Sequence, residues 1–151
     1  MYEISYGNKY EATKSLSKTD IAKCIRADIR EAIRDEKLPE GMKVSVRTKF
    51  FSGGSSIDIR VTALPADFPL VEADDRDGSK YGAWKHSYRY TDVAQSLKKA
   101  LKAISDAYNY DGSEIMVDYF HVRFYSDVDI SHDLWEAACL KLEAAESAVA
   151  A

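Results

Sequence analysis

The sequence contains few cysteines, which cross-link small proteins, and few prolines and glycines, which interrupt helices and strands. Its 151 residues include two cysteines, three prolines and seven glycines. Two cysteines are too few for the disulfide framework of a small secreted domain, and no CxxC or HExxH spacing of a zinc site occurs. Cys24 and Cys139 fall in helical patterns near apolar faces. We therefore expect two buried, reduced thiols, with a disulfide between them as the open alternative, and we expect no metal and no cofactor.

Long apolar runs and a large excess of one charge are also absent. No stretch approaches the ~18 uncharged apolar residues of a membrane span, and the first 20 residues lack the apolar core of a secretion signal. The formal net charge is -4 and the pI is about 5.4. A non-specific DNA coat would be basic, and a DNA mimic would be far more acidic. We expect a cytoplasmic protein, in a bacterial cell or an infected host, with no membrane partner.

The composition is that of a folded domain. Hydrophobic residues make up 46% of the chain and charged residues 30%, as in ordinary globular proteins. No repeat or linker divides the sequence, so we expect a single domain over residues 1–151. Residues 1–16 predict an N-terminal arm or short strand, and residues 127–151 predict a C-terminal helix with a frayed tail.

Helical periodicity is clear in three places, at about 19–36, 91–109 and 132–147. In the first, isoleucine recurs every four residues over 21–33, behind a capping pair at Ser17 and Asp20, with Thr19 as the alternative N-cap. Thr91 can cap the second helix, and Ser131 or Asp133 the third. Each pattern has one apolar side, so each helix is expected to pack that side onto a sheet.

Alternating apolar and polar residues predict the strands of that sheet. Residues 43–51 and 56–63 alternate, and SGGSS between them supplies Gly53 and Gly54 for a hairpin turn. Residues 115–125 predict a third strand. Phe50 and Phe124 are expected in the core, and residues 64–90 are expected to form a surface loop. The order α-β-β-α-β-α predicts an α+β fold, a two-layer sandwich in which the helices pack on one face of a small, mostly antiparallel sheet.

The polar sides of the predicted strands combine basic and aromatic residues. If the alternation holds, one face of the sheet carries seven of them: Arg47, Lys49, Arg60, Tyr119, His121, Arg123 and Tyr125. Cations beside flat rings suit the phosphates and bases of nucleic acids. Tyrosine and arginine are also favoured anchors of protein interfaces. An ordinary solvated face, or one covered by a third helix, stays open as an alternative.

Catalytic and metal-binding motifs are weak by comparison. The sequence has no GxSxG motif and no glycine-rich phosphate loop with its lysine. An acidic cluster near residue 130 could bind a divalent ion, although a turn with a helix cap explains it as well: Asp127, Asp129, His132 and Asp133. An enzyme with an unrecognised site is a third alternative, with three candidate residues: His86, Asp118 and His121.

Three segments resemble a known family, the large polyvalent protein-associated domain numbered 29: TDIAKCIRADIREAI, KVSVRTKFFSGGSSIDIRVT and YNYDGSEIMVDYFHVRFY. The resemblance covers about residues 17–126, and the hairpin is its most specific part. Such domains occur in phages, plasmids and other mobile elements, and no catalytic motif is established for them.

The resemblance implies a non-enzymatic accessory protein of a mobile element. Such a protein would bind a host macromolecule, most readily a host protein, and counteract host defence in the manner of anti-CRISPR or anti-restriction proteins. Nucleic-acid binding through the same basic and aromatic face is the alternative. A homodimer through a sheet edge is a further open arrangement.

Overall fold

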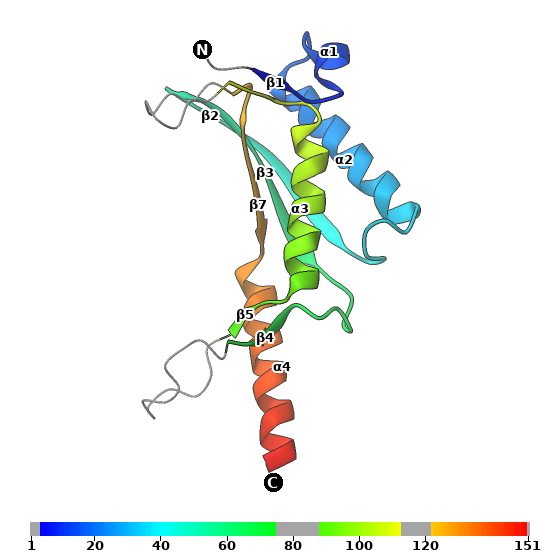
Figure 1. Cartoon of the computed structure of the whole chain (residues 1–151), viewed down its shortest axis with the longest axis vertical. Coiled ribbons are helices and arrows are strands. Elements are labelled where there is room, and N and C mark those ends of the chain that lie inside the picture. The colour runs from blue at the N-terminus through cyan, green and yellow to red at the C-terminus, as the bar shows by residue number, and fades with distance from the viewer. Residues whose placement is uncertain (1–3, 75–87, 113–121, 151) are drawn as a thin grey trace.

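The computed structural model describes residues 4–74, 88–112 and 122–150 (Figure 1). Its elements in chain order are β1 (Ser5–Tyr6), α1 (Tyr10–Thr13), α2 (Lys18–Arg34), β2 (Lys43–Phe51), β3 (Gly54–Ala63), β4 (Val71–Ala73), β5 (Tyr88–Tyr90), α3 (Asp92–Asp106), β6 (Tyr110–Asp111), β7 (Tyr125–Ile130) and α4 (His132–Ala150). The described residues form an α+β fold of helices and small sheets with no closed barrel. The fold class that the sequence predicts is confirmed.

The central sheet has three strands in the order β2-β3-β7. β2 and β3 form the predicted antiparallel hairpin, with Phe51 paired to Gly54 across the turn. The φ angle of Gly54 is 145°, a conformation that side-chain-bearing residues rarely adopt. β7 runs parallel to β3, and a parallel pair needs a crossover connection. The chain segment that contains α3 provides that connection.

The third strand lies later in the chain than the sequence predicts. The predicted strand at 115–125 falls mostly on residues 113–121, which lie outside the described residues. β7 begins at Tyr125 and continues to Ile130. Its alternation was hidden by aspartates: Val128 and Ile130 are buried, and the residue before each of them, Asp127 and Asp129, is acidic. Residues 125–130 are therefore an amphipathic strand rather than a turn, and α4 begins at His132, where the sequence predicts a helix start.

α2 and α3 cover one face of the central sheet, while α4 extends beyond the end of the sheet (Figure 1). The helices begin where the sequence predicts, because the Ser17 and Thr91 side chains accept hydrogen bonds from main-chain N–H groups three residues later. The main core side chains between helices and sheet are Ile21, Ile25, Ile29, Val46, Ile57, Ile59, Val61, Leu97, Leu101, Phe124, Val128 and Ile130. Each contributes about 1.5–3 kcal/mol by burial.

The prediction that Phe50 lies in the core is wrong. It follows the inward phase of β2, yet 68% of its surface is exposed. The hairpin end of β2 and β3 extends past α2 and α3 (Figure 1). Alternation places a side chain on a face of the sheet, but a helix must lie over that face to bury it.

The N-terminal segment packs against the end of α3. β1 pairs antiparallel with β6, and the Gly7 N–H donates to the Asn109 carbonyl at 2.8 Å. A Cβ at Gly7 would lie 2.3 Å from the Ala107 oxygen, so this close approach requires glycine. The expected loop at 64–90 contains the short antiparallel pair β4–β5 within its described residues.

Both edge strands of the central sheet have a carbonyl occupied by a cation from a helix. Arg26 on α2 donates to the Val46 carbonyl of β2, and Lys102 on α3 donates to the Ser126 carbonyl of β7 at 3.2 Å. These contacts tie the helix layer to the two outer strands.

Cys24 and Cys139 are free, half-buried thiols, and burial raises the pKa of Cys139. Within the described ranges, no helix combines the length and apolarity needed to cross a membrane.

Candidate binding face

The face of the central sheet opposite α2 and α3 is polar. Strand register places its side chains in three rows: Lys49–Ser56–Tyr125, Arg47–Asp58–Asp127 and Ser45–Arg60–Asp129. Residues two apart in a strand point to the same side, so these nine share one surface, which we call the outer face. Of the seven residues singled out in the sequence, Arg47, Lys49, Arg60 and Tyr125 lie on it, and all four are exposed.

Charges on the outer face are mixed and partly paired. The Lys49 ammonium lies 3.4 Å from the Asp58 carboxylate, and the Arg60 Nε lies 3.3 Å from the Asp129 carboxylate. Exposed pairs of this kind contribute only about 0–1 kcal/mol to stability, so their main effect is to orient the side chains. Arg47 forms no ion pair with any described residue. Its guanidinium is available to a partner.

An aromatic pair lies at the hairpin end of the outer face. The rings of Phe51 and Tyr125 have centroids 6.0 Å apart, and 49% and 40% of these residues' surfaces are exposed. The Tyr125 ring also lies against Gly54, 3.7 Å from the position of a Cβ there. Phe50 is exposed on the opposite side of the same strand end. The sequence does carry a signal for this end of the site, because two phenylalanines directly precede a glycine turn. The sequence-based prediction of the site did not include them.

A polar depression of about 300 Å³ lies beside the aromatic pair, lined by Ser45, Arg47, Lys49, Asp58, Arg60, Thr62 and Ser131. No apolar side chain lines it. The hydroxyl of Thr62 donates within the protein, to the Lys43 carbonyl at 3.3 Å. The depression is therefore a surface of cations and hydroxyls with a single carboxylate.

Arg123 does not lie on the outer face, which corrects the prediction. Only 8% of its surface is exposed. Its guanidinium donates to the Tyr108 carbonyl at 2.8 Å, to the Thr13 hydroxyl at 3.2 Å and to the Thr13 carbonyl. The guanidinium carbon also lies 5.0 Å from the centre of the Tyr10 ring.

The position of Arg123 explains this difference. It precedes β7, so strand alternation does not govern its direction, and its acceptors lie at the carboxyl ends of α1 and α3. Cations are favoured at such helix ends. Burial lowers the pKa of Arg123, but a guanidinium stays charged at neutral pH.

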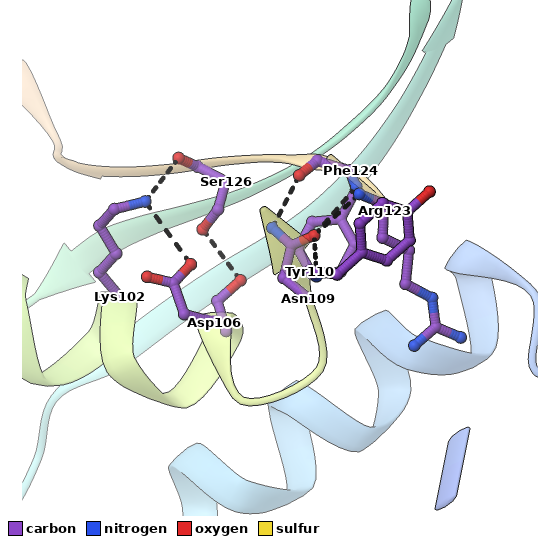
Figure 2. Close-up of polar contacts among 8 residues, drawn as sticks. Lys102, Asp106, Asn109, Tyr110, Arg123, Phe124 and Ser126 are labelled. Atoms are coloured by element: carbon purple, nitrogen blue, oxygen red, sulfur yellow. Dashed lines mark hydrogen bonds and ion pairs between the residues drawn. The ribbon is translucent and has the colours of Figure 1, made fainter. Parts of the chain in front are cut away.

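A hydrogen-bonded group around Asn109 aligns β7 and therefore the acidic side of the outer face (Figure 2). The Asn109 amide nitrogen donates to the Phe124 carbonyl at 2.8 Å. Its oxygen accepts from the main-chain N–H groups of Tyr110 at 2.9 Å and Arg123 at 3.1 Å. On the inner side of β7, the Ser126 hydroxyl donates to the Ser105 hydroxyl at 3.0 Å. The start of β7 is thus held to the end of α3.

The remaining candidates from the sequence divide into two groups. Four lie outside the described residues: His86, Asp118, Tyr119 and His121. The acidic cluster is described, and Asp127 and Asp129 lie on alternate positions of β7 rather than in a turn. In the described part of the chain, no group of three or more histidine, cysteine, aspartate or glutamate residues is arranged to hold a metal ion.

The outer face combines an exposed aromatic pair, an available arginine and a polar depression on one rigid sheet. Such a surface can bind a partner with matching shape and charge. Comparison of the whole chain with protein-family models, with curated proteins and with solved structures finds no match in any of the three.

Proposed function

We propose that this protein is a binding domain that attaches to another protein through its outer face. The observation that supports this most directly is the exposure of Phe51 and Tyr125 side by side, on the same face as Arg47, which pairs with no described residue. Aromatic and arginine side chains are the commonest energetic anchors of protein interfaces. Burying an exposed phenylalanine ring contributes about 1.5–3 kcal/mol.

The charges favour a protein over a nucleic acid as the partner. Three aspartates share the outer face, and two of them already pair with Lys49 and Arg60. A phosphate backbone laid across the sheet would meet these carboxylates and gain few free cations. A protein surface can match both signs at once.

The resemblance to the polyvalent-protein family supports a host protein as the partner and a mobile element as the source. On that basis the domain would act as an accessory protein against host defence, as anti-CRISPR and anti-restriction proteins do. Binding by occupying a surface requires no catalytic group, which agrees with the chemistry of the outer face.

The test is chemical cross-linking and affinity capture from a bacterial extract, followed by identification of the cross-linked residues. We compare the natural protein with the double variant Phe51→Ser/Tyr125→Ser. Val93→Ser is the matched control, because Val93 is 51% exposed on α3, away from the outer face. A partner that cross-links to the outer face, is lost in the double variant and is kept by the control supports the proposal. Partners retained equally by both variants would contradict it.

A further inference from the structure

The depression on the outer face contains hydrogen-bond donors that the protein itself does not use. Arg60 contacts Asp129 through Nε, so the terminal nitrogens of its guanidinium have no hydrogen-bond acceptor among the described residues. All the donors of Arg47 are likewise unused in the described part of the chain. Two arginines with unused donors in a depression lined by polar and charged residues indicate an oxyanion ligand.

The side chains of Arg47 and Arg60 can contact the same oxyanion group of a ligand. Arg47 on β2 is paired with Asp58 on β3, so Arg60 is its diagonal neighbour two residues along β3. Diagonal neighbours have Cα atoms roughly 7–8 Å apart, within the span of two long side chains. The ion pair of Lys49 and Asp58 lines the same depression, together with the hydroxyl-bearing residues Ser45 and Ser131.

We propose that this depression binds a single phosphate monoester group carried by the partner protein. A phosphorylated side chain has a charge of about -1.5 to -2 and three strong acceptor oxygens, which match the two guanidinium groups and the neighbouring hydroxyls better than a carboxylate does. The inference rests on the proposed function, since it names the group by which the partner is recognised.

The charges around the depression fit a single phosphate group better than the backbone of a nucleic acid. Asp127 and Asp129 occupy the β7 side of the outer face, beside Asp58 and Arg60 of β3. A phosphate in the depression meets one lining carboxylate, Asp58, which already pairs with Lys49 at 3.4 Å, whereas the next phosphates of a nucleic acid would also approach Asp127 and Asp129. The aromatic pair at the hairpin end would contact residues that flank the phosphorylated side chain.

The first experiment titrates inorganic phosphate into isotopically labelled protein and follows main-chain and arginine Nε resonances by NMR. Saturable shifts at Arg47, Arg60 and Thr62 are expected, and Arg47→Ala or Arg60→Ala should weaken binding about tenfold, the effect of losing one charge-assisted hydrogen bond. Arg30→Ala is the control, because Arg30 is an exposed arginine on α2. Equal shifts with chloride at the same ionic strength, or equal weakening by Arg30→Ala, would overturn the inference.

The second experiment compares a short neutral peptide containing phosphoserine with its unphosphorylated form and with single-stranded DNA. Tighter binding of the phosphopeptide, at the same resonances as phosphate, supports the inference. Tighter binding of DNA at those resonances would overturn it in favour of a nucleic-acid partner. If no phosphate compound binds while Phe51→Ser/Tyr125→Ser still abolishes partner capture, the phosphate inference fails and the proposed function stands.

Discussion

Replacing Arg123 with methionine tests whether this arginine stabilises the fold, in contrast to Arg47, which we expect to bind a partner. The substitution keeps much of the side-chain volume and removes the guanidinium that bonds to Tyr108 and Thr13. Each hydrogen bond to a charged group contributes about 1.5–3 kcal/mol, and each buried carbonyl left unpaired costs about 1–3 kcal/mol. Removing the buried cation recovers part of this, because its desolvation cost of several kcal/mol disappears. The expected net loss is about 2–4 kcal/mol, a large part of the roughly 5–15 kcal/mol of a typical domain.

The assay is urea denaturation followed by circular dichroism, with Arg47→Met as the matched control. Arg47 is exposed on β2, so its replacement should change the free energy of unfolding by no more than about 0.5 kcal/mol. Partner binding should show the opposite order, with Arg47→Met weakened and folded Arg123→Met retained. A change below about 0.5 kcal/mol for Arg123→Met would refute the reasoning, because a buried guanidinium with three acceptors could not then be holding the N-terminal segment.

Three further substitutions test contacts around the end of α3. Gly7→Ala should lower the free energy of unfolding by about 1–3 kcal/mol through overpacking, since two carbonyl oxygens lie 2.3 Å from the new methyl position; Gly53→Ala, with no atom closer than 4.0 Å, should change the urea midpoint little. Asn109→Ala should cost about 2–4 kcal/mol in thermal unfolding, because a buried carbonyl and several N–H groups lose their partner; an unchanged melting temperature would contradict the role given to Asn109. Burial and the hydrogen bond to Asp28 raise the pKa of Tyr108 above its usual 10.0. Above pH 10 the unfolded state therefore loses this proton more readily than the folded state, and stability should fall as pH rises; Tyr108→Phe should reduce that loss in melting temperatures measured from pH 9 to 11.

The elements that follow a simple period could be predicted from the sequence. The isoleucines of α2 and the alternation of β2 and β3 depend only on neighbours within one element. For the same reason the sequence placed Arg47, Lys49 and Arg60 together, because strand register preserves the side of each residue. β7 was missed because its outward residues are aspartates, which in isolation favour turns and helix caps.

The errors at Arg123 and Phe50 have a different origin. Both depend on what lies over a residue, and that information is not local in the sequence. Arg123 is buried because α1 and α3 present carbonyls to it, and Phe50 is exposed because neither α2 nor α3 covers the hairpin end of its strand. The aromatic end of the outer face could be found only after the hairpin was seen to extend past the helix layer.

The helix-borne cations at the sheet edges have a consequence for self-association. A fourth strand, from a second copy or from a misfolded chain, would have to displace Arg26 from the Val46 carbonyl or Lys102 from the Ser126 carbonyl. Buried or edge carbonyls engaged by charged donors make poor templates for strand addition. Growth of the central sheet into edge-paired dimers or fibres is therefore opposed at both edges, so association is directed to the outer face with its depression.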